Sequence, residues 1–228
     1  MESSVFQYGC PDICVQHVND PRTSTAITQV DLLTLSLGHV VDQPCPHYLE
    51  IGVSVGKTFS TVTSSLPACA TAVAFDLEKP SPFLRSVLAP IQNASLPSNI
   101  QQFVGPGGQR VFYITGSVLE AAGWDSLSGL GVQFHLIFSD ALHTPEGVAA
   151  EYREIHARKL LDTSAGFAML WDDCAPGLRG PFNELCKEYA LDCKVPMLHA
   201  WLGMYEAAHP TCAAFSGKVP IPGTAPLS

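Results

Sequence analysis

The chain has 228 residues and a formal net charge of −9 at pH 7. This length is enough for one well-buried domain, and the acidic charge, with no cluster of Lys and Arg to offset it, argues against a nucleic-acid or anionic-membrane partner. No run reaches the ~18 consecutive apolar residues that a membrane span requires, so a small-molecule ligand is favoured.

The amino-terminal region predicts a cover for the domain. A helix is expected from Thr23 to Leu37, ending at Gly38, within a helical cover of residues 1–45. The first eight residues lack a basic patch followed by an apolar run, so they do not resemble a secretory signal. The eight cysteines contain no C-x-x-C pair, which argues against zinc and leaves reduced thiols in a cytoplasmic protein as the expectation. The sequence Asn93-Ala94-Ser95 matches a glycosylation sequon and is interpreted as an ordinary loop.

The segment from Tyr48 to Thr58 changes from an apolar strand to a turn of small residues and then to a helix. Glycine allows a tight turn and a close approach to a ligand, and the following helix offers unpaired N–H groups. A P-loop would need four residues between its first glycine and Gly-Lys-Thr, whereas three separate Gly52 from Gly56. The G-x-G-x-x-G fingerprint would need glycines where Ser54 and Phe59 stand.

The pattern that fits is E-x-G-x-S-x-G. It resembles the first motif of class I S-adenosylmethionine-dependent methyltransferases, with a serine in place of the middle glycine. The resemblance implies that the loop passes under the methionine part of the cofactor and that the acid holds the loop or the ammonium group. The cofactor-binding residues expected in this motif are Glu50, Gly52, Ser54, Gly56 and Thr58. A buried strand followed by a helix in any α/β protein is the alternative.

A second strand is predicted from Ala72 to Phe75, and Asp76 follows it about 20 residues beyond the glycine turn. A carboxylate at this edge can accept hydrogen bonds from two ribose hydroxyls. The alternative is that Asp76 only begins the turn that contains Glu78 and Pro80. A helix is expected over Ser81 to Ile91.

A third strand begins at Arg110, after a loop that Pro97 and Gly105 to Gly108 predict. It ends in Thr115-Gly116-Ser117, and the resemblance implies that Ser117 contacts the adenine of the cofactor. Related methyltransferases often carry an acid in this loop, and this chain does not.

A fourth strand is predicted from Phe134 to Phe138, and the segment that follows contains Asp140 and His143. Thr144 is a suitable N-cap for the helix that continues from Gly147 to Leu161. The segment resembles the D-x-x-H-x-x-E-x-V stretch of one branch of small-molecule methyltransferases. In that branch a fifth strand, here Gly166 to Trp171, also ends in two acids, which are Asp172 and Asp173.

Parallel strands bring their carboxyl ends to one edge, so Asp140, Asp172 and Asp173 are expected to converge beside the cofactor, which Asp140 also contacts. Oxygen ligands of this kind favour Mg²⁺ or Ca²⁺. The resemblance to metal-dependent O-methyltransferases implies that these acids hold such an ion against the hydroxyl groups of the substrate. His143 is the candidate general base, and Asp140 is expected to be catalytic as a ligand of the ion that lowers the pKa of the acceptor hydroxyl. The alternatives are a capping role for Asp172 and Asp173 and a structural role for His143.

Alternating strands and helices predict an α/β fold, a doubly wound, mainly parallel Rossmann-like sheet with helices on both faces. One methyltransferase-like domain is expected over residues 1–215, with further helix at Pro181 to Ala190, closing strands in Val195 to Met204, and a flexible tail at 216–228. The predicted function is methyl transfer from S-adenosylmethionine to a small-molecule hydroxyl with metal assistance. A metal-independent S- or N-methyltransferase, a nucleotide-hydrolysing enzyme, a non-catalytic protein of the same fold and a homodimeric assembly remain open.

Overall fold

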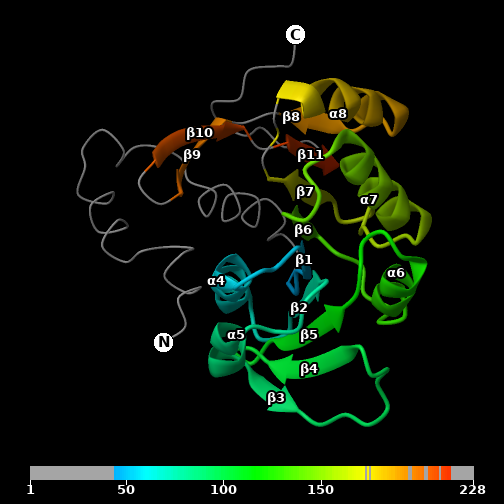
Figure 1. Ribbon diagram of the computed structural model, residues 1–228. Coiled ribbons are helices and arrows are strands. Elements are labelled where there is room, and N and C mark those ends of the chain that lie inside the picture. The colour runs from blue at the N-terminus through cyan, green and yellow to red at the C-terminus, as the bar shows by residue number, and fades with distance from the viewer. Residues whose placement is uncertain are drawn as a thin grey trace.

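The structure is a computed structural model that describes residues 44–172, 174, 176–194, 197–202, 205–210 and 212–216. The expected amino-terminal helix, Asp173 and residues 217–228 lie outside these described residues. Figure 1 gives the arrangement of the described elements.

A nine-stranded sheet forms the centre of the described fold, in the order β3-β4-β5-β2-β1-β6-β7-β11-β8. Its five central strands are parallel: β5 (Arg110–Thr115), β2 (Thr71–Asp76), β1 (Tyr48–Ile51), β6 (Leu136–Ser139) and β7 (Phe167–Trp171). Antiparallel strands extend both edges: β3 (Ala89–Ile91) and β4 (Ile100–Val104) beyond β5, and β11 (Cys212–Ser216) and β8 (Asp192–Lys194) beyond β7. A separate antiparallel pair consists of β9 (Met197–Leu202) and β10 (Tyr205–Pro210).

Helices cover both faces of this sheet (Figure 1). One face carries α4 (Lys57–Ser65) and α5 (Pro82–Val87), and the other carries α6 (Ala121–Ser128), α7 (Pro145–Ala157) and α8 (Pro176–Glu188). Along β1, Tyr48 packs with the first group, whereas Leu49 and Ile51 pack with the second. Burial on both faces explains why the central strands have nearly continuous apolar sequences. The prediction of a doubly wound α/β fold is confirmed.

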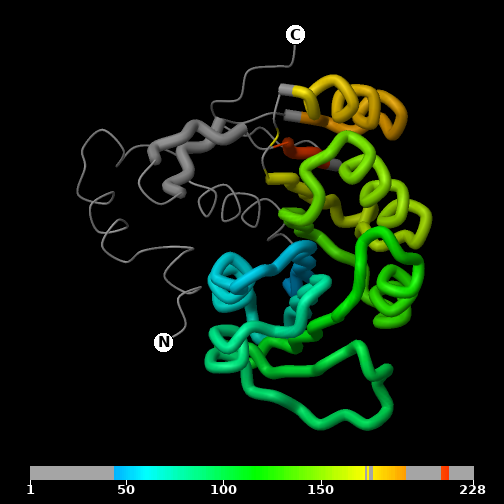
Figure 2. The backbone as a smooth tube through the Cα atoms, viewed as in Figure 1, coloured from blue at the N-terminus to red at the C-terminus, as the bar shows by residue number. Residues whose placement is uncertain are grey.

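The path of the chain reverses next to β1. From β1 the chain moves outward past β2 to the edge strands β3 and β4, returns to β5 beside β2, and then crosses to β6 on the other side of β1 before it continues to β7 (Figure 2). In open α/β sheets, the crevice beyond the carboxyl ends of the strands at such a switch point is where ligands bind.

The expected helix from Ser81 to Ile91 is only half correct. Ser81 caps α5 by accepting a hydrogen bond from the Leu84 N–H at 3.1 Å, and Pro82 occupies the first turn. The helix ends at Val87, and β3 occupies the end of the expected helix. It pairs with β4, which lies in the segment that was expected to be a loop. Pro90 accounts for the change, because the residue before a proline avoids the helical conformation and proline itself suits an edge strand.

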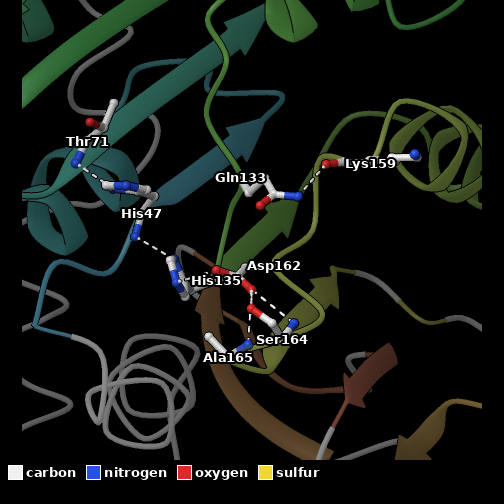
Figure 3. A network of polar contacts seen from close by, with 8 residues as sticks. All are labelled: His47, Thr71, Gln133, His135, Lys159, Asp162, Ser164 and Ala165. Carbon is white, nitrogen blue, oxygen red and sulfur yellow. Dashed lines mark hydrogen bonds and ion pairs between the residues drawn. The ribbon is translucent and has the colours of Figure 1, made fainter.

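A buried polar network joins the amino ends of three strands (Figure 3). The backbone N–H of His47 donates to Nδ1 of His135 at 3.0 Å, and the backbone N–H of Thr71 donates to Nδ1 of His47 at 3.1 Å. Nε2 of His135 lies 3.4 Å from Oδ2 of Asp162. Burial is the main cause that lowers the pKa of both imidazoles, so the protonated form of each ring is disfavoured.

Three disulfides join the six cysteines of the described residues: Cys45 with Cys69, Cys174 with Cys212, and Cys186 with Cys193. The expectation of reduced thiols is therefore wrong for these residues. No C-x-x-C spacing marks these pairs, because the fold brings together cysteines that the sequence separates. Within the described ranges, no helix is long and apolar enough to cross a membrane.

Candidate functional site

The glycine turn begins at the carboxyl end of β1. Gly52 has φ +78°, and its N–H donates to the Phe75 carbonyl at 2.9 Å. A Cβ at this position would lie 2.5 Å from the backbone oxygen of Asp140, so a side chain cannot fit. The turn therefore packs backbone to backbone against the loop that follows β6.

Ser54 and Gly56 also adopt left-handed backbone conformations, with φ +51° and φ +86°. Gly56 is the N-cap of α4, and a Cβ there would lie 2.3 Å from the side chain of Leu84 in α5. The serine thus keeps a conformation that glycine usually supplies. The Ser81 hydroxyl donates to the Val55 carbonyl at 2.7 Å and fixes the same turn against the start of α5.

Asp76, the last residue of β2, holds the turn with its carboxylate. Its Oδ2 accepts hydrogen bonds from the N–H groups of Val53 at 2.6 Å and Ser54 at 2.8 Å. Its Oδ1 accepts from the N–H of Glu78 at 2.8 Å. Asp76 therefore forms its own turn, as one interpretation of the sequence expected, and also organises the glycine turn.

A pocket of about 770 Å³ opens beside this turn at the carboxyl edge of the sheet. Five of the residues expected at the cofactor site line it: Gly52, Ser54, Asp76, Ser117 and Asp140. The lining does not include the other four expected site residues of the described chain that precede β7, namely Glu50, Gly56, Thr58 and His143. Volumes of this size are typical of pockets that hold small-molecule ligands.

Glu50 is buried beneath the turn, where its carboxyl accepts a hydrogen bond from the hydroxyl of Tyr48. Burial raises the pKa of Glu50 well above its ordinary value. This position supports the turn from below and does not present a carboxylate to the pocket. Of the other expected residues, Thr58 lies in the first turn of α4. Ser117 lies in the loop after β5, where its hydroxyl accepts a hydrogen bond from the Leu119 N–H at 3.1 Å.

Two leucines that the sequence did not single out also line the pocket. Leu77 follows Asp76 and is 72% exposed, and Leu119 lies in the loop after β5 and is 75% exposed. When an apolar ligand surface covers large apolar side chains that are this exposed, the burial of their surface favours binding. Their place just beyond the carboxyl ends of two adjacent strands is the only sequence signal that could have identified them.

His143 pairs with Asp140, which lines the pocket. Nε2 of His143 lies 3.2 Å from Oδ1 of Asp140, and both side chains are more than one third exposed. The helix that follows is fixed as expected, because the Thr144 hydroxyl accepts a hydrogen bond from the Gly147 N–H at 3.0 Å. The imidazole is thus held beside a carboxylate and remains accessible from solvent.

Asp172 lies beside Asp140 because their strands are neighbours in register. Ser139 pairs with Trp171, and the Asp172 N–H donates to the Ser139 carbonyl at 2.9 Å. Among the described residues, no group of three or more His, Cys, Asp or Glu side chains could hold a metal ion. Asp173, the third expected ligand, is outside that set, so the metal site stays a prediction.

Glu151 of α7 is a buried acid that the sequence did not single out. It is 1% exposed, and its Oε2 accepts a hydrogen bond from the Ser139 hydroxyl at 2.6 Å. Burial raises its pKa to about 7, while Ser139, the nearby indole of Trp171 and the charge of His143 act to lower it. The indole N–H of Trp171 does not reach hydrogen-bonding geometry with this carboxyl. A titratable group therefore lies directly under the strand end that carries Asp140.

No protein-family model and no curated protein matches the chain. Its structure is similar to that of the O-methyltransferase TomG from Streptomyces achromogenes, involved in tomaymycin synthesis and solved with S-adenosylmethionine, at 17% identity and TM-score 0.52, covering 94% of each chain. It is also similar to an O-methyltransferase from Bacillus cereus, solved with S-adenosylhomocysteine, at 17% identity and TM-score 0.51, covering 94% of this chain and 91% of that one.

A fibrillarin from Aeropyrum pernix, solved with natively bound S-adenosylmethionine, matches at 15% identity and TM-score 0.48. That match covers 74% of this chain, and the chain spans 66% of the fibrillarin. At identities this low, the likeness to the two O-methyltransferases establishes a shared fold.

Proposed function

We propose that the protein is an S-adenosylmethionine-dependent methyltransferase that methylates a hydroxyl group of a small molecule. The observation that carries this proposal is the hydrogen bonding of Asp76 to the glycine turn at the wall of the pocket. The fold shared with two O-methyltransferases, one solved with S-adenosylmethionine and the other with S-adenosylhomocysteine, supports it.

The hydrogen bonds that Asp76 already accepts limit how many ribose hydroxyls its carboxylate can bind. A carboxylate has about four acceptor sites, and three backbone N–H groups already use three of them. One acceptor site is then left for a ribose hydroxyl, rather than the two that the sequence suggested. Leu77 and Leu119 provide exposed apolar surface for the adenine, and Ser117 lies in the same loop as Leu119.

The transfer step breaks the bond between the methyl carbon and the sulfonium sulfur, whose electron pair stays on sulfur, and forms a bond from the methyl carbon to the acceptor oxygen. His143 would take the hydroxyl proton on Nδ1, while Nε2, which faces Asp140, donates to its carboxylate, and that carboxylate stabilises the resulting imidazolium. Holding both reactants in line at the pocket mouth supplies much of the rate enhancement in such a reaction.

The carboxylates of Asp140, Asp172 and Asp173 would hold Mg²⁺ or Ca²⁺, which lowers the pKa of a bound hydroxyl when present. Adjacent register places the backbones of Asp140 and Asp172 on neighbouring strand ends, and oxygen donors suit a hard cation. If His143 alone accepts the proton, or if the acceptor is sulfur or nitrogen, the chain would act without a metal.

The first test is calorimetric titration with S-adenosylhomocysteine in Mg²⁺ and again in chelator. Wild type should bind, and Asp76→Ala should weaken binding about 10- to 100-fold or more, because it removes a charge-assisted hydrogen bond and frees the turn. Asp125→Ala is the matched control, since it removes an exposed carboxylate from α6 and should leave binding unchanged. The absence of binding by wild type in both conditions would contradict the proposal.

A second test separates the acceptor classes. Turnover of a panel of diol, thiol and amine acceptors is measured with Mg²⁺ and with chelator, for wild type and Asp172→Asn. Loss of diol methylation in both chelator and the variant, with S-adenosylhomocysteine binding retained, would support metal assistance. Equal turnover in all conditions would favour the metal-independent alternative.

A further inference from the structure

The disulfides indicate the kind of compartment in which this chain folds. Six cysteines are paired, and the bonds close sequence separations of 24, 38 and 7 residues. Disulfides of this kind form and persist in oxidising compartments and are rare where glutathione and thioredoxin keep thiols reduced. This observation argues against the cytoplasmic location that the sequence suggested. In an oxidising compartment of the secretory type, the sequon at Asn93 would be exposed to N-glycosylation.

Asn93-Ala94-Ser95 is the only N-x-S/T sequence in the chain. It lies in the loop between β3 and β4, where the residues from Ile91 to Ser95 are all exposed. The Ser95 hydroxyl donates to Oδ1 of Asn93 at 2.6 Å. The middle residue is alanine rather than the proline that would prevent modification.

The amide of Asn93 has room for a sugar. Its Nδ2 carries two hydrogens, and one is donated to Oε1 of Gln102 in β4 at 2.9 Å. A glycan would replace the other hydrogen, so the bond to Gln102 can persist. None of the residues from β3 to β4 lines the 770 Å³ pocket, so a glycan here would leave the candidate site open.

A glycan at this position would also protect an exposed sheet edge. β3 is the outermost strand on its side of the described sheet, its three residues are exposed, and Ile91 is 40% exposed (Figure 1). Unpaired edge strands invite pairing with other chains, and natural proteins cover or charge them. Asn93 follows the last residue of β3 by two positions, and a bulky, solubilising glycan there would shield that strand.

We propose that Asn93 is an N-glycosylation site of a protein that folds in an oxidising, secretory-type compartment. In this modification a bond forms between Nδ2 of Asn93 and the anomeric carbon of an oligosaccharide carried on a lipid pyrophosphate. The bond from that carbon to the pyrophosphate oxygen breaks, the pyrophosphate leaves with the electron pair, and the amide loses one proton. The proposal is independent of methyl transfer, because neither its site nor its readout involves the cofactor pocket.

The test uses the full chain, secreted from cultured eukaryotic cells behind a secretory leader, together with three variants. Intact mass is measured before and after digestion with a peptide N-glycosidase. Wild type and Ser95→Thr, which keeps the required hydroxyl, should both lose an oligosaccharide mass on digestion. Asn93→Gln and Ser95→Ala should show no loss, with melting temperatures near that of the deglycosylated wild type.

Thiol alkylation without reductant, followed by peptide mapping, tests the three disulfides in the same samples. The six cysteines of the three bonds should resist alkylation until a reductant is added. A secreted wild type that carries no glycan on Asn93 would overturn the glycosylation site. Alkylation of these six cysteines before reduction would overturn the three disulfides, and with them the argument for an oxidising compartment.

Discussion

Ser54 holds a backbone conformation that costs a residue with a Cβ about 1–2 kcal/mol. Replacing it with glycine relieves this strain and costs about 0.5–1 kcal/mol in the entropy of the unfolded chain. We therefore expect Ser54→Gly to raise the free energy of unfolding by roughly 0.5–1 kcal/mol in denaturant titrations. Ser64→Gly within α4 is the opposite control, because glycine destabilises a helix interior. A loss of stability in Ser54→Gly would mean that the hydroxyl makes a contact that outweighs the strain.

Glu151 should make the protein less stable as the pH rises from about 4.5 to about 7. Its folded pKa of about 7 lies above the ordinary value of 4.5, so the unfolded chain releases its proton first in this range. Each unit of difference between the folded and unfolded pKa is worth about 1.4 kcal/mol, so the free energy of unfolding should fall by roughly 3 kcal/mol at most. Glu151→Gln should remove this dependence and be more stable than wild type at pH 8, as measured by urea unfolding across the pH range. An identical pH profile for both proteins would show that Glu151 titrates normally.

His143→Gln should lower kcat about 10²- to 10⁴-fold if the imidazole removes the acceptor proton. The Kd for S-adenosylhomocysteine should stay unchanged, because His143 does not line the pocket. The rate with an acceptor of low pKa, which arrives already deprotonated, should fall much less. His156→Gln, at the far end of α7, is the matched control and should retain full activity. Equal losses with acceptors of high and low pKa would indicate a structural role.

The sequence located the site through the strand ends and could not show how each side chain is used. Asp76 and Asp140 reach the pocket because parallel strands end at one edge, which the alternation of elements predicts. Tyr48 and Glu50 share a face of β1 because they are two residues apart, but the hydrogen bond that turns Glu50 toward Tyr48 depends on packing beneath the turn. The exposure of Leu77 and Leu119 follows from the shape of the pocket, and an isolated leucine after a strand carries no such information.

At the scale of elements, the parallel centre was predictable and the antiparallel edges were not. The strands that flank the site are apolar runs bounded by turn residues, so their length and composition identify them. β3 is three exposed residues behind a short helix, and its pairing with β4 is a non-local contact. Pro90 was the available signal, because a helix through that position would have been broken.

The network at the amino ends of β1, β2 and β6 should make the sheet sensitive to acid. The pKa values of His47 and His135 are lowered below 6.5, so as the pH falls through 6.5 the unfolded chain gains protons before the folded chain. The contribution of the two neutral histidines to the free energy of unfolding is therefore fully present above about pH 6.5 and decreases below it. His135→Gln should flatten this decrease when unfolding is followed from pH 7 to pH 5.

Asp162→Asn provides the matched test of that network, because the charge of Asp162 acts to raise the pKa of His135. Removing the charge should lower the pKa of His135 further and steepen the acid sensitivity. The two variants should thus differ from wild type in opposite directions. A shift in the same direction for both would show that packing, rather than titration, governs this edge.

For the whole molecule, the charge and composition bounded the kind of protein, but they gave no information on the disulfides. Eight cysteines allow 105 complete pairings, and the connectivity follows from the fold rather than from the spacing. Cys45 precedes β1, and Cys69 lies between α4 and β2, so their bond ties the amino end of the first β-α-β unit. The sequence alone does not predict this pairing, because Cys45 and Cys69 come together only when β1 and β2 pair in parallel.

The bond between Cys45 and Cys69 should therefore stabilise the whole fold. Closing a sequence separation of 24 residues restricts the unfolded chain, which is worth about 3 kcal/mol in the chain-entropy model. The double variant Cys45→Ser and Cys69→Ser should lose this amount in denaturant unfolding, or roughly 6–12 °C in Tm for a domain of this size. Full reduction of both proteins is the control, because wild type then loses the same crosslink and the difference should vanish. A difference that persists after reduction would assign the effect to packing of the sulfur atoms rather than to the crosslink.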